Sequence, residues 1–138
     1  MKYTFAILSL VLLTACTSRS LQKKSLNQPP SVALEEKWKG HEEYIGGIIN
    51  AVDKRWKWIV KRTKDYPAPG TKVVVTFRLE ADTGDIPEII RVDSSGTKQA
   101  ADMCVSAIVS QAPFGRWTTE MKGQIGDATD VTFTFHYQ

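Results

Sequence analysis

The alternation of side chains near the carboxyl end of the chain constrains the fold more than any other feature. Residues 131–137 alternate in character, with Val131, Phe133, Phe135 and Tyr137 on one side and Thr132, Thr134 and His136 on the other. Successive side chains of a strand point to opposite faces of its sheet. The pattern therefore predicts a strand with one buried and one solvated face.

Two segments have the spacing of amphipathic helices. Residues 35–64 carry an apolar stripe of Trp38, Ile45, Ile48, Ile49, Val52, Trp56, Ile59 and Val60. Residues 98–111 carry a second stripe of Ala101, Cys104, Val105, Ile108 and Val109. Such stripes face a core. Gly46 and Gly47 each weaken a helix by about 1 kcal/mol relative to alanine, so the first segment is either one helix or two. Trp58 lies opposite the first stripe, either exposed to a partner or folded under a loop.

The residue pattern in the middle of the chain predicts a β-hairpin. Residues 72–80 are rich in β-branched side chains, residues 82–85 have turn composition, and residues 86–92 form a second run. Pro87 lacks an N–H, which places the second strand at a sheet edge or limits it to pairing on one side. The predicted fold is α+β in the order helix, strand, strand, helix, strand, with two helices on one face of a three-stranded antiparallel sheet.

The amino terminus has the layout of an export signal. Lys2 precedes an uncharged apolar run over residues 5–13, which is too short to span a bilayer. The residues that follow, Thr14, Ala15 and Cys16, complete with Leu13 a motif that resembles the bacterial lipobox. We predict a signal peptide over residues 1–15, a lipidated Cys16 opening a flexible tether over 16–34, and a domain over 35–138. The alternative is an ordinary cleaved signal with an incidental cysteine.

Composition argues against several kinds of site. The net charge of +3 is too small for a dedicated nucleic-acid binder. After lipidation of Cys16, Cys104 has no partner for a disulfide, and His41, His136 and Cys104 lack metal-site spacing, so we expect neither metal nor cofactor. A basic run with interleaved tryptophans, residues 54–64, favours a solvated helix end. Binding to anionic lipid or to an acidic partner stays open.

Asp82, Thr83 and Gly84 spell the catalytic triplet of aspartic proteases. That chemistry needs two carboxylates that share a proton, and the chain holds a single copy of the triplet, although a homodimer would supply a second. A hairpin turn explains the same residues. We therefore predict that the protein is not an enzyme and has no small-molecule substrate, with a small hydrolase as the remote alternative.

The order of these segments resembles the C-terminal domains of TonB and TolA. The likeness covers residues 44 to 138 and includes the strand over 73–79, the turn at 82–84, the strand and break over 89–96, and the helix leading to Pro113. TolA-like domains pair a cysteine at the position of Cys104 with one at the start of the first strand, where this chain has Val73. The resemblance implies docking to envelope partners. A lipid anchor in place of an inner-membrane helix argues against the family's motor-coupled function.

The predicted function follows from these features. We expect an envelope lipoprotein, facing the periplasm and more consistent with the outer than the inner membrane, that binds a protein or peptide by strand addition. The expected partner surface is the last strand, assumed to lie at a sheet edge, together with Trp58. The alternative is a structural subunit of an envelope assembly that uses Trp58 and the basic helix face.

Overall fold

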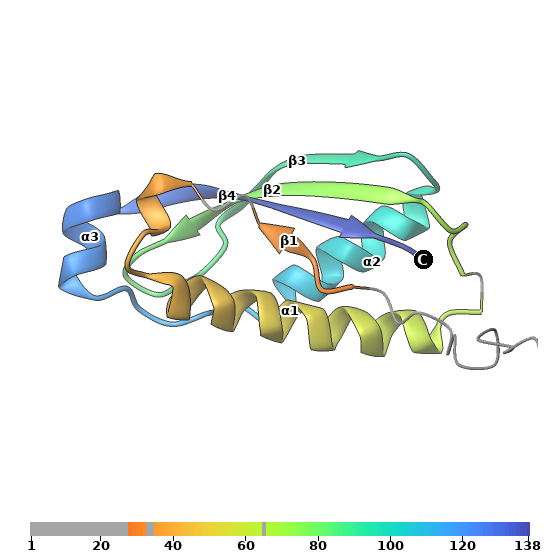
Figure 1. Ribbon diagram of the computed structural model, residues 1–138, viewed down its shortest axis with the longest axis horizontal. Helices are drawn as coiled ribbons and strands as arrows, with labels where there is room; N and C mark the ends of the chain where they lie inside the picture. The colour runs from red at the N-terminus through yellow and green to blue at the C-terminus, as the bar shows by residue number, and fades with distance from the viewer. Residues whose placement is uncertain (1–27, 33–34, 65) are drawn as a thin grey trace, which may run out of the picture.

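The computed structural model describes residues 28–32, 35–64 and 66–138 of the chain (Figure 1). The described elements are β1 (Ser31–Val32), the 3-10 helix η2 (Glu36–Trp38), α1 (Glu42–Arg62), β2 (Lys72–Glu80), β3 (Glu88–Ser94), α2 (Lys98–Val109), α3 (Thr119–Ile125) and β4 (Ala128–His136). The α+β class and the antiparallel sheet are confirmed. The predicted number of three strands is wrong, because the described sheet has four in the order β1-β4-β2-β3.

Helix α1 begins later than predicted and is not broken by its two glycines. Trp38 belongs to η2, and Gly40, which has a φ of 85°, separates η2 from α1. Gly46 and Gly47 lie on the exposed side of α1, and Ile45 and Ile48 beside them are buried in the core. Packing of these flanking side chains stabilises the helix against the unfavourable propensity of glycine.

The predicted hairpin is present, with its first strand at the predicted residues 72–80 and its second strand at Glu88–Ser94 in place of the predicted 86–92. β2 pairs with β3 on one side and with β4 on the other. β3 begins directly after Pro87 and is an outer strand of the described sheet, as the proline predicted. The register shifts between Thr76 and Phe77, which pair with Arg91 and Ile89. Ile90 is therefore the extra residue of a β-bulge.

Two predictions about the sheet boundary are wrong. Ser31 and Val32, expected within the tether, form β1 and pair with Thr134 and Phe133 of β4. β4 is consequently not an edge strand of the described sheet. Pro30 is buried, and Val32 packs against the core, which explains why this short segment is held in place. A two-residue strand is too short to show a period in the sequence.

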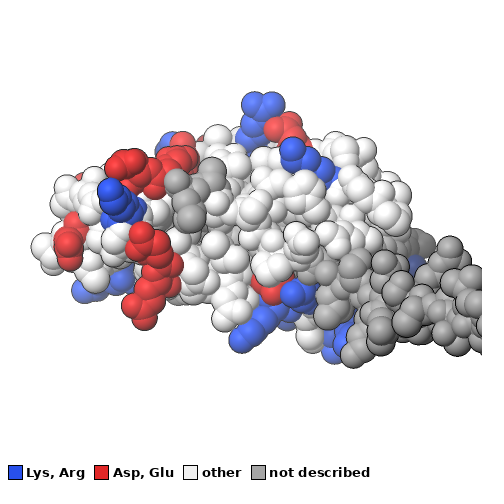
Figure 2. All heavy atoms as spheres, viewed as in Figure 1, with Lys and Arg blue, Asp and Glu red and all other residues white. Residues whose placement is uncertain are grey.

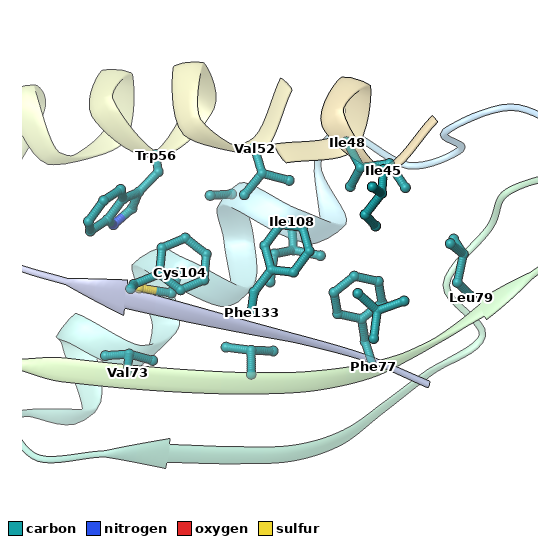
Figure 3. Packing of buried hydrophobic residues seen from close by; sticks show 14 of the residues in the cluster. Ile45, Ile48, Val52, Trp56, Val73, Phe77, Leu79, Cys104, Ile108 and Phe133 are labelled. Atoms are coloured by element: carbon teal, nitrogen blue, oxygen red, sulfur yellow. The ribbon is translucent and has the colours of Figure 1, made fainter. Parts of the chain in front are cut away.

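A single core lies between the sheet and the helices α1 and α2 (Figure 3). Its largest fully buried side chains include Trp56 from α1, Phe77 from β2 and Phe133 from β4. The predicted order of elements left the segment between Pro113 and the last strand without regular structure, and part of that segment is the helix α3. The hydroxyl oxygen of Thr118 accepts a hydrogen bond from the Met121 N–H at 3.1 Å and caps this helix. Buried Met121 anchors it to the core.

Candidate functional site

The inward face of β4 is part of the core and is not available to a partner. Val131, Phe133, Phe135 and Tyr137 were predicted as partner-binding residues, and each is at most 2% exposed. Phe133 packs against Phe77, with ring centroids 5.5 Å apart. The sequence predicted that these side chains share a face, and that is confirmed. Because these side chains are buried, only the backbone of β4 would be available to a partner strand.

The outward face of β4 is polar and partly paired within the sheet. The hydroxyls of Thr132 and Thr76 lie 2.9 Å apart across neighbouring strands. Thr134 is half-buried, and His136 is exposed at the end of the strand. This face therefore has the wet character that the alternation predicted, with hydroxyls that already hydrogen-bond each other.

The outer edge of β4 is occupied at two places by the chain itself. Tyr137 N–H donates to the carbonyl of Thr71 at 2.9 Å. The backbone N–H and C=O groups of odd-numbered β4 residues therefore point toward β2, and those of even-numbered residues point toward the other edge of the strand. β1 lies opposite Thr134. The carbonyl of Asp130 accepts a hydrogen bond from Lys37 Nζ at 2.9 Å. These contacts leave little of the β4 edge for a partner strand.

β3 offers the more open edge. Ser95 N–H donates to the carbonyl of Lys72 at 2.9 Å, so the backbone N–H and C=O groups of residues 91, 93 and 95 point toward β2. The N–H and C=O of Val92 and Ser94 consequently point away from the sheet, where no other described strand pairs with them. Ile90 and Val92 are 40% and 39% exposed. A strand whose outer edge has unpaired backbone groups and exposed apolar side chains is a template for pairing with another chain.

Several features restrict how long a strand β3 could accept. Pro87 precedes it, the bulge at Ile90 interrupts the register, and Arg91 and Asp93 form an ion pair at 2.7 Å on the outer face. Prolines, bulges and charges are common means of blunting an edge. The regular part that remains is residues 91–94, which is enough for a short extended segment.

A second exposed surface lies on α1, on the side away from the core. Trp58 is 45% exposed, which decides between the exposed position and the position under a loop that the sequence left open. The guanidinium of Arg55 lies 4.3 Å and that of Arg62 3.7 Å from the Trp58 ring centroid, one from the turn before and one from the turn after. Each such cation–π contact stabilises an exposed pair by about 0.5–1 kcal/mol. The arrangement holds the indole in place between two cations.

A groove of about 410 Å³ runs beside Trp58 along α1. Its lining includes Gly47 and Ala51, which are small, and the cationic Lys54 and Arg55. Gln111 contributes from the segment after α2. Asp53, the one acidic residue in the second half of α1, is largely buried and pairs with Lys57 at 2.9 Å. None of the described residues that line the groove carries a carboxylate.

The Asp82 triplet lies in the hairpin turn, where its carboxylate is paired with a cation. Lys122 Nζ lies 2.7 Å from Asp82 Oδ1. The hydrogen bond and charge of Lys122 hold the pKa of Asp82 below its ordinary value. A proton-sharing catalytic pair needs the opposite shift in one of its carboxyls. The local electrostatics therefore favour a structural role for this triplet.

Cys104 is a buried free thiol. Burial raises the pKa of Cys104 to about 12, and the hydroxyl of Tyr137 lies 3.4 Å from its sulfur. Val73 and Cys104 lie in the same part of the core (Figure 3). A thiol of this kind is a small apolar packing group rather than a nucleophile.

The two histidines lie apart from each other. His41 precedes α1 and hydrogen-bonds Gln124 at 2.9 Å, far from His136 at the other end of the sheet. In the part of the chain that the structure describes, no three His, Cys, Asp or Glu side chains are grouped for a metal ion. Within that same part, no helix has the length and hydropathy needed to cross a membrane. Cys16 and the predicted signal peptide lie outside the described residues.

Comparisons with models of known protein families, with curated proteins and with solved structures found no match. The functional surfaces therefore rest on the geometry of this chain. The sequence pattern pointed to Trp58 as a partner-binding residue but not to Ile90 or Val92. The signal for them was Pro87, which had already marked their strand as an outer one.

Proposed function

We propose that this protein is a lipid-anchored, non-enzymatic docking domain of the cell envelope that binds an extended segment of a protein partner along the edge of β3. One observation carries the proposal: Ile90 and Val92 are exposed apolar side chains on an outer strand. The backbone groups of Val92 and Ser94 would pair with the partner strand, and the two apolar side chains would contact it.

Two features of the sequence support this proposal. The lipobox-like motif ending at Cys16 provides the anchor. The resemblance to TonB and TolA C-terminal domains provides the docking role. The site differs from the one expected from the sequence, because β1 and Lys37 occupy positions along the β4 edge and leave β3 as the longer open strand.

Site-specific photocrosslinking in cells tests the proposal. A photoreactive amino acid at Ile90 of the full chain should trap a protein partner, and the same amino acid at exposed Glu120 on α3 should not. The Val92→Pro variant removes an N–H that points away from β2, and proline is tolerated at such positions of an edge strand. We expect this variant to reduce the crosslink at position 90 at least tenfold.

The Val92→Thr variant is the matched control, because it keeps both the β-branched shape and the N–H. Thermal unfolding of the two variants should differ little, which separates loss of the edge donor from loss of the fold. Crosslinking at Ile90 that persists at full yield in Val92→Pro would overturn strand addition at β3. With the photoreactive amino acid at Thr134 instead, a crosslink that rises in Ser31→Pro, where β1 is weakened, would assign docking to the β4 edge.

A further inference from the structure

The exposed side of α1 carries cations that have no acidic counterpart nearby. Lys54, Lys61 and Arg62 are exposed, and Arg55 is half-buried against Trp58. No ion pair links any of these four to another described residue. In Figure 2 the visible acidic side chains gather mainly toward the end that carries α3, whereas the C-terminal half of α1 shows mostly basic ones. The charge of this surface, defined by Lys54, Arg55, Trp58, Lys61 and Arg62, calls for an anionic occupant.

We infer that this basic surface binds the headgroups of anionic phospholipids, so that α1 lies against the membrane that holds the lipid anchor. The inference deepens the proposed function and rests on it for the anchor at Cys16. It assigns an orientation: the side of the domain away from α1, including the β3 edge, would remain free for the partner (Figure 1).

The geometry of α1 favours a lipid surface over an acidic peptide. Ala51, Arg55, Trp58 and Arg62 follow one another at spacings of three and four residues, so they form a row along one side of the helix. A layer of lipid headgroups presents anions along the whole row, whereas the charges of an acidic peptide would have to align with the individual cations. Trp58 is the exposed one of the four tryptophans and lies within that row, and an indole held between cations suits the boundary between headgroups and acyl chains.

The anchor makes a weak surface contact effective. Residues 17–27 connect Cys16 to the described chain and span at most ~40 Å when fully extended. Tethering at that reach converts membrane contact into an intramolecular event, with an effective concentration of about millimolar. Each basic residue near an anionic surface contributes roughly fivefold to the affinity. The basic surface therefore needs no deep pocket to be occupied.

Trp58 serves as an intrinsic fluorescence probe of lipid contact, because the other tryptophans, Trp38, Trp56 and Trp117, are buried in the core. The full lipoprotein is reconstituted into vesicles of zwitterionic phosphatidylcholine, or of phosphatidylcholine with 30% phosphatidylglycerol, each containing brominated acyl chains. We expect the bromine atoms to quench tryptophan emission in the anionic vesicles at least twofold more than in the zwitterionic ones. The difference should disappear in Trp58→Phe and at 0.5 M salt.

The charge variant Lys54→Gln/Arg55→Gln/Arg62→Gln should lose the quenching. Its affinity for the anionic surface should fall by about 100-fold. Lys39→Gln/Lys98→Gln/Arg116→Gln removes the same charge elsewhere and should retain it. Quenching that is equal in both vesicle types, or unchanged in the first variant, overturns the inference. Protection of Trp58 from acrylamide by polyglutamate but not by anionic vesicles also overturns it and assigns the surface to an acidic protein.

Flotation with the zwitterionic vesicles tests the anchor separately. Protein that floats with them but shows no anionic-lipid quenching has its anchor and lacks the lipid-binding surface. Protein that fails to float, yet is quenched by the anionic vesicles in excess lipid, has the surface and lacks the anchor, which refutes that part of the proposed function. Photocrosslinking at Ile90 reports on partner docking independently of both.

Discussion

The hydroxyl of Tyr137 donates a hydrogen bond to the carbonyl oxygen of Ala100 at 2.8 Å, which ties the residue after β4 to the first turn of α2. The same hydroxyl accepts a hydrogen bond from Trp56 Nε1 at 3.3 Å. One side chain thus joins both large helices to the end of the sheet. Burial raises the pKa of Tyr137, so the hydroxyl stays protonated and able to donate throughout the physiological range.

Replacing Tyr137 with phenylalanine should therefore destabilise the domain. The ring is kept, but Trp56 Nε1 loses its acceptor in a buried place, so the free energy of unfolding should fall by about 1–3 kcal/mol. Urea denaturation measures this change. Tyr66→Phe is the control, because Tyr66 meets the same ring edge-on but is 48% exposed, and its effect should be below about 0.5 kcal/mol. Equal losses in the two variants would contradict the role given to the Tyr137 hydroxyl.

The thiol of Cys104 should be inert in the folded protein. Its side chain is fully buried, and a pKa of about 12 leaves almost no thiolate at pH 8. We expect iodoacetamide to modify Cys104 at least 100-fold more slowly in buffer than in 8 M urea, as followed by mass spectrometry of the fragment that contains it. Rapid modification of the folded protein would show that α2 opens locally far more often than a packed core permits.

The raised pKa of Cys104 also makes stability depend on alkaline pH. Burial raises the pKa of the thiol from 9.0, the ordinary value for an exposed cysteine, to about 12, so the folded state binds this proton more tightly than the unfolded state. Its contribution is therefore fully present below pH 9 and is lost as the pH rises toward 12, by about 1.4 kcal/mol per pH unit. Urea melts between pH 8 and 10.5 should show a steeper decline for the wild type than for Cys104→Ala. Parallel curves would refute this linkage.

Alanine at Gly46 should stabilise the protein. Gly46 lies within α1, and a Cβ there meets nothing within 4 Å. Removing the backbone freedom of glycine should raise the free energy of unfolding by about 0.5–1 kcal/mol. Gly46→Pro, which breaks the helix, should lower it by about 3 kcal/mol. A destabilising Gly46→Ala would indicate that α1 bends at this position in solution.

The elements that the sequence predicted correctly are those with enough residues to show a period. β2, α2 and β4 carry their pattern over at least nine residues. The four side chains predicted for the buried face of β4 are all buried, whereas in α2 the predicted Val109 is 47% exposed. α3 has seven residues with Met121 as its one buried side chain, and β1 has two residues, so neither gives a periodic signal.

The candidate site was less predictable because sheet order is a tertiary property. Alternation shows which face of β4 is buried, but it does not show which strand lies beside it. The sequence placed the partner at β4, and the structure puts β1 there opposite Thr134. One helix is enough to define the face on which Trp58 lies, so the sequence placed it opposite the apolar stripe. Whether a loop covers that face is again a tertiary property, and the structure leaves Trp58 45% exposed.

The turn between β2 and β3 provides the sharpest test of the packing at Asp82–Gly84. Gly84 has a φ of 74°, and a Cβ there would lie 2.9 Å from the carbonyl carbon of Gly115 and closer still to its nitrogen and oxygen. Both the backbone conformation and the close approach require glycine. Gly84→Ala should lower the free energy of unfolding by about 2–4 kcal/mol. Gly123→Ala, in α3 with open space around it, should be neutral or stabilising, so a similar loss in both would show that the turn does not depend on this approach.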